Sequence, residues 1–187
     1  MPHLLLKNLP RYECLLEAAK EFPDLDPSAC EAFLNLLRAG DEGARVVEAE
    51  LARHNITQGR LAVMMILLNR CGGDVPTLGP AELADAAGVS RATMTGLIDT
   101  LERDGLVTRD PATVDRRMMI VCLTEKGRTL LQEILPNHFK RMAWLMSPLS
   151  ESERHTLVGL LDKIQQQAVL YTASSLPTAA PAAIATA

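Results

Sequence analysis

The sequence predicts a mainly α-helical fold with one small β-hairpin, and three observations support this class. Apolar residues recur at helical spacing both before residue 56 and after residue 124. Between these positions, two short amphipathic segments are separated by Gly88, and two runs of β-forming residues follow them. We therefore divide the chain into residues 1–55, 56–124 and 125–171, followed by a tail at 172–187.

Residues 1–55 are predicted to be helical. Residues 10–21 are expected to form a short helix that stops before Pro23, because proline cannot continue a helix. Apolar and small side chains then follow one face of a longer helix at steps of four and three: Phe33, Leu37, Gly40, Ala44, Val47 and Leu51. Because glycine weakens a helix, Gly40 and Gly43 predict a bend or break near them.

Residues 80–103 are predicted to form a helix, a tight turn and a second helix. Pro80 suits a first helical position, where its missing N–H is not needed. Gly88 can adopt a positive φ and so end the first helix, and Ser90 is a favoured N-cap for the second. The helical period places Met94, Leu97, Ile98 and Leu101 on one face of the second helix.

The hairpin follows directly. Residues 106–108 and 119–123 are rich in β-formers, and the loop between them carries Asp115, Arg116 and Arg117. A bare two-stranded hairpin is marginal in water, so we expect it to pack on the helices. Two helices followed by a basic hairpin make a winged helix-turn-helix, a shape that fits one helix into a DNA groove.

The outward residues of the second helix and the loop are the candidates for DNA contact. The helix N-terminus, capped by Ser90, can hold a phosphate, and Arg91, Thr93 and Thr95 are placed to meet base edges. One loop arginine would enter the minor groove, where the negative potential is strongest, while Asp115 braces it. The whole candidate set is Ser90, Arg91, Thr93, Thr95, Gly96, Arg103, Asp115, Arg116 and Arg117.

Other interpretations of these residues stay open. A helix, glycine turn and second helix also pack inside ordinary all-α proteins, and Arg116 and Arg117 also suit a solvated turn. A winged helix can serve as a protein-docking module without binding DNA. The net charge of −4 is the best support for that alternative.

Residues 125–171 are predicted to form further helices that mediate dimerisation. Pro136 is expected to interrupt the helix that starts at Thr124, and Ser150 with Glu153 forms a capping box for the last helix. That helix carries a broad apolar stripe, made of Leu157, Leu160, Leu161, Ile164 and Ala168. A sister subunit is the expected partner of this stripe, with an intrachain bundle as the alternative. Residues 172–187, rich in Ala, Thr, Ser and Pro, are predicted to be a disordered tail.

Composition narrows the function classes. Aromatic residues make up only 3% of the chain, which disfavours single-strand binding by base stacking. The acidic balance disfavours a sequence-blind nucleic-acid coat, although a small patch of arginines can still face phosphate. The four cysteines and four histidines show no metal spacing, and no phosphate loop or catalytic pair stands out. We expect no enzyme activity, no metal and no cofactor.

No targeting segment stands out in the sequence. The apolar run Leu4–Leu6 is too short for a signal peptide, and the longest apolar run, Leu61–Leu68, is far shorter than a membrane span. A cytoplasmic protein without membrane contact is therefore expected.

Residues 56–130 resemble the multiple antibiotic resistance regulator (MarR) family. The residues that carry the resemblance are AELADAAGVSRATMTGLIDTLERDGLVTR at 81–109, DRRMMIVCLTEKGR at 115–128 and ITQGRLAVMMILL at 56–68. Asp115 and Arg117 match the Asp-x-Arg pair of the family's wing, and Leu123, Thr124 and Gly127 match the start of its long fifth helix.

The resemblance implies an obligate homodimer that carries no catalytic activity. It implies that DNA is released on ligand binding or thiol oxidation. In this family a ligand binds at the junction between the dimerisation helices and the helix that enters the major groove, and it changes the spacing of the two copies of that helix. We expect a repressor of inverted-repeat sites, with half-sites about 10 base pairs apart.

Two groups of residues are candidates for effector sites. His54, Arg60, Met64 and Met65 lie near the junction where members of this family hold aromatic carboxylates or related anions. For His54 and Arg60, helix-end capping and surface charge are the simpler explanation. Cys14 and Cys30 fall in the N-terminal helices, where some similar regulators keep an oxidation-sensing thiol, although buried cysteine is common without such a role.

Overall fold

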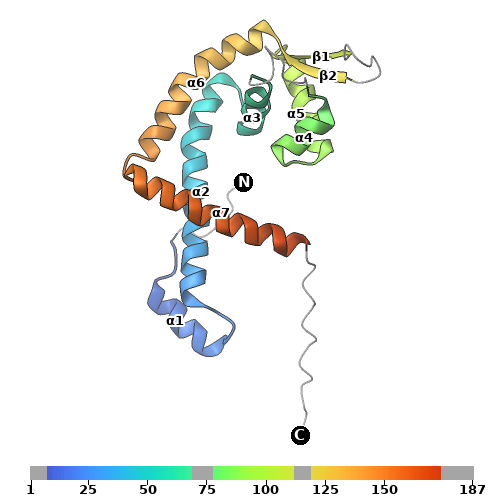
Figure 1. Cartoon of the computed structure of the whole chain (residues 1–187). Helices are drawn as coiled ribbons and strands as arrows, with labels where there is room; N and C mark the ends of the chain where they lie inside the picture. Colours follow the sequence, from blue (N-terminus) through green and yellow to red (C-terminus); the bar gives the residue numbers. More distant parts are fainter. Residues whose placement is uncertain (1–7, 69–77, 112–118, 174–187) are drawn as a thin grey trace. The chain divides into compact units, whose positions relative to one another are not determined.

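A computed structural model of the chain describes residues 8–68, 78–111 and 119–173. Its helices are α1 (Tyr12–Glu21), α2 (Pro27–Leu51), the short 3-10 helix η1 (Ala52–His54), α3 (Gln58–Leu68), α4 (Pro80–Ala87), α5 (Arg91–Arg103), α6 (Glu125–Leu145) and α7 (Glu151–Ala173) (Figure 1). Strands β1 (Val107–Pro111) and β2 (Met119–Leu123) pair as an antiparallel hairpin. The predicted class, mainly helical with a β-hairpin wing, is confirmed. The chain clusters into two units, Met1–Met142 and Ala143–Ala187.

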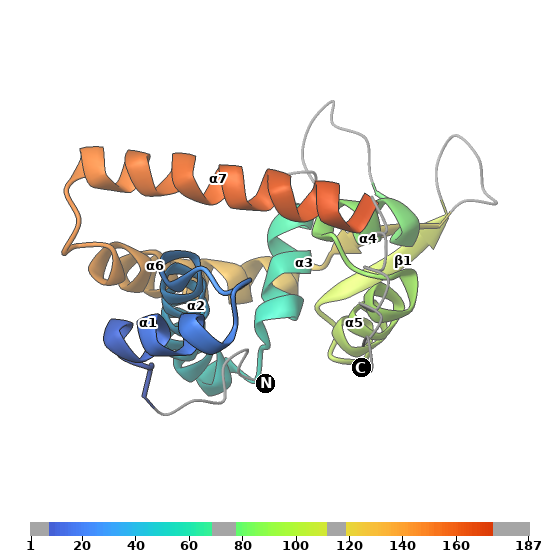
Figure 2. The same ribbon diagram turned by 90° about the horizontal axis from the view of Figure 1, so that it is seen from below.

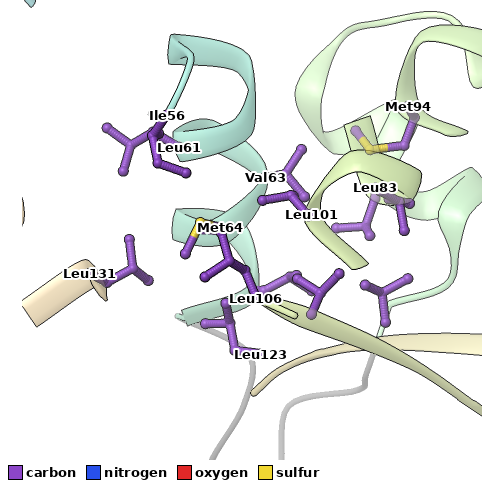
Figure 3. Packing of buried hydrophobic residues seen from close by; sticks show 14 of the residues in the cluster. Ile56, Leu61, Val63, Met64, Leu83, Met94, Leu101, Leu106, Leu123 and Leu131 are labelled. Carbon is purple, nitrogen blue, oxygen red and sulfur yellow. The ribbon is translucent and has the colours of Figure 1, made fainter. Parts of the chain in front are cut away.

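In the first unit, α3, α4, α5 and the hairpin share a hydrophobic core. Buried side chains come from each of these elements, as the close view shows (Figure 3): Val63 and Met64 from α3, Leu83 from α4, Met94 and Leu101 from α5, and Leu123 from β2. Leu131 of α6 joins the same cluster. Burying an aliphatic side chain of this size stabilises the fold by about 1.5–3 kcal/mol. The shared core therefore holds the buried face of α5 against α3 and α4.

Helix α1 packs against α2, as two views of the first unit show (Figure 1 and Figure 2). It ends where the helix predicted over residues 10–21 ends but begins two residues later, at Tyr12, and Leu15 is its buried residue. Of the bend or break predicted in α2, the break is wrong, because the helix runs from Pro27 to Leu51 through Gly40 and Gly43, and the bend stays a prediction. Glycine lowers helix propensity by about 1 kcal/mol but keeps the N–H and C=O groups that the helical ladder needs.

Helix α6 is also longer than the sequence predicted. The predicted interruption at Pro136 is wrong, since the helix continues from Glu125 to Leu145 with this proline inside it. A proline removes one donor to the carbonyl four residues before it. Here both Pro136 and Gln132 are exposed, so that carbonyl lies on the side open to water. Leu131 and Ile134, buried on the opposite side, hold the helix on the core.

The second unit contains α7. Its predicted capping box is confirmed, because the Ser150 N–H donates to Glu153 Oε2 at 2.8 Å and the Glu153 N–H donates to Ser150 Oγ at 3.4 Å. These bonds begin α7 at Glu151. Hydrogen bonds from Ser150, chiefly its hydroxyl, hold the pKa of the Glu153 carboxyl below its ordinary value. Helix α7 ends at Ala173, two residues into the predicted tail, and the rest of that tail lies outside the described residues.

Candidate nucleic-acid interface

Helix α5, which we call the reader helix after its predicted role in DNA contact, has one buried face and one exposed face. Met94, Ile98 and Leu101 are fully buried, whereas Arg91, Thr93, Thr95, Gly96 and Arg103 are exposed. The helix begins as predicted, with the Ser90 hydroxyl accepting a hydrogen bond from the Thr93 N–H at 3.1 Å. The described members of the predicted contact set thus share the outside of one short, well-supported helix.

The turn before the reader helix fixes its direction. Gly88 has a φ of 64°, the left-handed conformation that glycine adopts without strain. The Val89 N–H donates to the carbonyl of Ala84 at 3.0 Å, which closes the end of α4. At the other end of α4, the Glu82 carboxylate accepts from the Gly79 N–H at 2.7 Å. Helix α4 is therefore capped at both ends, and its buried Leu83 and Ala84 anchor the turn.

The polar groups on the exposed face differ in what they can still offer to DNA. The Thr95 hydroxyl donates to the Arg91 carbonyl at 2.9 Å, so its methyl group and an oxygen lone pair are left for a partner. The Thr93 hydroxyl lies 2.9 Å from the Ser90 hydroxyl. A Cβ built on Gly96 would meet nothing within 4 Å, so open space lies directly over the backbone there.

The hairpin is attached to the helices at its base. Arg109 pairs with Val121 in the register of the two strands, and the Val121 N–H also donates to the Leu78 carbonyl at 3.0 Å. Val107 and Val121 are buried, which supplies the packing that a two-stranded hairpin needs. The loop beyond it, with Asp115, Arg116 and Arg117, lies outside the described residues, so their roles stay predictions.

A cluster of ion pairs that the sequence analysis missed joins the hairpin to the reader helix. Arg109 of β1 donates through Nη2 to Asp99 and through Nη1 to Glu102, both on α5. The hydrogen bond to Asp99 raises the pKa of the Arg109 guanidinium, and Glu102 adds to the effect. The sequence shows two carboxylates three residues apart on a helix and an arginine on the next strand, but this spacing does not indicate that they meet.

The start of α6 explains the Leu-Thr-x-x-Gly motif. The Thr124 hydroxyl donates to the Gly105 carbonyl at 2.8 Å and accepts from the Gly127 N–H at 3.0 Å, so it caps α6 and ties it to the end of α5. A Cβ on Gly127 would lie 2.2 Å from the Leu106 carbonyl oxygen. Only glycine permits this close approach of α6 to the base of the wing.

Comparison with known proteins decides the family. The model of the MarR family matches residues 56–119. The transcriptional repressor YetL of Bacillus subtilis (strain 168) is 33% identical over 156 residues, which cover 83% of this chain and 92% of YetL. The chain belongs to the MarR family. The resemblance seen in the sequence is confirmed, and the protein is a DNA-binding transcriptional regulator of the MarR type.

Solved structures agree with the fold of this MarR-family chain. The crystal structure of the transcriptional regulator PA4135 is similar with a TM-score of 0.59 and 30% identity, over 72% of this chain and 95% of PA4135. The repressor CouR bound to a 23-mer DNA duplex is similar with a TM-score of 0.63 and 26% identity, over 71% of this chain and 90% of CouR. CouR from Rhodococcus jostii RHA1 has also been crystallised with p-coumaroyl-CoA, and that structure matches with a TM-score of 0.62 at 21% identity, over 71% of this chain and 90% of that one.

The predicted effector residues of this MarR-family chain lie in or beside the core. Arg60 pairs with Asp104 at the end of α5 and donates to the Asn55 carbonyl at 3.0 Å. Met64 is fully buried, and Met65 packs against the core from its edge. His54 Nδ1 lies 3.7 Å from Glu133 Oε1. The structure gives each polar residue of the set an internal partner.

A surface pocket of about 440 Å³ lies beside the predicted effector residues, although none of them is among its described lining residues. Those lining residues are Glu48, Ala52, Asn55, Ile56, Thr57 and Gln58.

The predicted redox residues are free thiols in different helices. Cys14 of α1 is exposed, and Cys30 of α2 is partly buried. Oxidation sensing stays a prediction. In the described ranges, no three His, Cys, Asp or Glu side chains gather to hold a metal ion. No helix in the same ranges combines the length and the apolar character that a membrane span requires.

Proposed function

We propose that two copies of this chain bind an inverted-repeat DNA site, each placing α5 in the major groove and its wing loop in the minor groove. The observation that carries the proposal is the division of α5 into a fully buried face and an exposed face with Arg91 at its N-terminal end. A helix that is packed against the protein on one face and exposed on the opposite face can enter the major groove. Ser90 and the helix N-terminus would hold a phosphate, while Arg91, Thr93 and Thr95 face base edges. The repressor CouR, which has a similar fold, has been solved bound to a 23-mer DNA duplex.

The charge distribution supports a specific complex rather than general adhesion. The whole chain carries −4, so long-range attraction to DNA is weak. Binding would depend on a few well-placed cations, and these would be Arg91, Arg103 and the loop arginines. We propose repression as the outcome, and the likeness to the repressor YetL over most of both chains supports it.

Exposed apolar side chains support a homodimer. In α7, Leu160 and Ile164 of the predicted stripe are each about half exposed, at 52% and 48%. Phe139 of α6 in the first unit is 50% exposed. Large exposed apolar surface on a protein marks a contact with another molecule. A second copy is the proposed partner, because each half of an inverted repeat needs its own reader helix.

The effector is proposed to be an aromatic or other anionic molecule that acts at the junction of η1 and α3. CouR binds p-coumaroyl-CoA, which is both aromatic and anionic. An anion that reached Arg60 would compete with Asp104, the residue that follows the last turn of α5. If the anion replaced Asp104 as the partner of Arg60, the C-terminal end of the reader helix would lose this ion pair. This gives the proposed ligand a direct route to DNA release, with oxidation of exposed Cys14 as the second route.

A fluorescence titration tests the proposal. The full chain is added to the duplex upstream of its own gene, with a scrambled duplex of equal length as control. We expect the specific complex to be at least about 1,000-fold tighter at moderate salt. Equal affinity for both duplexes would contradict sequence-specific binding and favour a protein-docking module.

A further inference from the structure

The exposed face of the reader helix carries an acidic residue that a DNA-binding surface would be expected to avoid. Asp99 lies four residues after Thr95 and three after Gly96, so it shares their side of α5. Its side chain remains 56% exposed, and the side chain of Glu102, one turn further, is 39% exposed. Two unpaired carboxylates at this position would repel the phosphate backbone.

Arg109 changes the charge of this surface from a neighbouring element. Its guanidinium reaches from β1 to both carboxylates at once, and its side chain is only 24% exposed. Arginine can serve two acceptors together because its N–H groups form a rigid fork. The pairing joins hairpin and helix at positions ten and seven residues apart in sequence. The same side chain therefore sets the charge of the reader face and the attachment of the wing.

We propose that Arg109 is a positioning residue of the DNA-binding surface: it offsets one of the two negative charges of Asp99 and Glu102 and holds the wing hairpin on the reader helix, without contacting DNA. This inference rests on the proposed use of α5 as the reader. It assigns a function to an arginine that would otherwise be counted among the phosphate contacts. Its guanidinium is directed at protein carboxylates, and its hydrogen bonds to them are charge-assisted.

The raised pKa of Arg109 agrees with this geometry, since the carboxylates favour its charged form. Loss of Arg109 would leave a local charge of −2 where the three groups now sum to −1. It would also free the base of the wing to move away from α5. Both effects weaken a complex that needs helix and wing to reach two grooves together.

A double-mutant cycle tests the proposal with four proteins: the native chain, Arg109→Ala, Asp99→Asn with Glu102→Gln, and all three substitutions combined. Affinity for the specific duplex is measured over a range of salt concentrations. We expect Arg109→Ala to lower affinity by at least about tenfold in the native background. In the Asn/Gln background the same change should cost less than about threefold, because there are no carboxylates left to neutralise.

The alternative gives a different pattern. If Arg109 binds phosphate directly, its removal costs the same factor in both backgrounds and lowers the salt slope by about 1 in each. That result would overturn the inference. Arg45→Ala removes a cation that pairs with Glu42 on α2, so it is the control for the change in net charge, and less than about twofold loss is expected.

Folding is controlled in the same experiment. Thermal unfolding of each variant shows whether it is folded at the binding temperature. If Arg109→Ala is unfolded, Arg109→Lys replaces it in the cycle, and its loss of affinity should again shrink in the Asn/Gln background. An undiminished loss contradicts the inference. Should the native chain fail to prefer the specific duplex, the proposed function fails instead, so the two failures are distinguishable.

Discussion

Helices α5 and α7 both carry an apolar stripe in sequence, yet the two stripes have different surroundings. In α5, Met94, Ile98 and Leu101 are fully buried by other elements of the first unit. In α7, Leu157, Leu160 and Ile164 are exposed. The apolar face of α5 is thus covered within one chain, whereas α7 keeps apolar surface that, in our proposal, a second copy covers. A single chain would be sufficient to fold α5, whereas a pair of chains would set the positions of the two α5 helices relative to each other.

The largest expected effect concerns the buried stripe of α5. Ile98→Ala removes a fully buried side chain and leaves a cavity, which should lower the free energy of unfolding of the first unit by about 2–5 kcal/mol. Chemical denaturation at several protein concentrations measures this loss, and the cost should not depend on concentration. A loss below about 1 kcal/mol would show that the reader helix is not held by this core.

The matching change in α7 should act on association instead. Leu160→Ala in both copies should weaken the homodimer by roughly 1 kcal/mol per copy, because its partner surface is on the other copy and 52% of the residue is left to be buried there. Sedimentation equilibrium of variant and native protein measures the dimer dissociation constant. An unchanged constant, or a native chain that is monomeric throughout, would remove α7 from the proposed interface.

Arg91 probes the exposed face of α5. Arg91→Ala should weaken binding to the specific duplex by about 1–3 kcal/mol. If Arg91 meets a base edge, the preferred sequence changes, and if it meets phosphate, affinity falls evenly and the salt slope decreases by about 1. Selection of preferred duplexes and a salt titration separate the two. The absence of both effects would exclude Arg91 from the interface.

One glycine in each of the two helices has free space around it, and substituting these two glycines should give a smaller difference in DNA affinity. Gly96 of α5 and Gly159 of α7 both have nothing within 4 Å of a built Cβ. Alanine at either position should favour the helix by about 1 kcal/mol. Gly96→Ala should nevertheless weaken DNA binding, because its methyl group enters the space where the duplex approaches, whereas Gly159→Ala should leave binding unchanged. Equal DNA affinity for both variants would show that the duplex does not approach α5 at Gly96.

The smallest expected effect is a pH dependence at the start of α7. The pKa of Glu153 is lowered in the folded state, so its contribution to stability is present above the ordinary glutamate pKa and is lost as the pH falls through the lowered value. Ser150→Ala removes the hydroxyl that lowers the pKa most and should reduce this dependence. Helicity followed by circular dichroism during acid titration measures the difference. Identical titrations would contradict the assigned cause.

The sequence predicted the winged helix closely because its signals are local. Gly88, Ser90 and the apolar period of α5 each act within a few residues, and the structure has the turn, the cap and the buried face where they indicated. The errors arose where distant packing overrides a local preference. Pro136 and Gly40 weaken their helices, but buried residues such as Ile134 and Leu51 keep those helices in place.

Pairs between elements were beyond the reach of sequence patterns. Arg109 and its two carboxylates come together only when the hairpin folds back on α5, and Arg60 meets Asp104 across 44 residues. Periodicity reports which face of a helix is apolar, but not which neighbour lies against it. The reader face was therefore predictable, whereas the ion pairs that orient it were not.

Binding by two symmetry-related copies is tested most directly by the affinity of the native chain for two duplexes that differ only at the centre of the inverted repeat. Inserting about five base pairs turns one half-site by half a helical turn, so two reader helices related by symmetry can no longer enter both major grooves. We predict that affinity falls to the level of a single half-site. Equal affinity for the native and lengthened duplexes would contradict it.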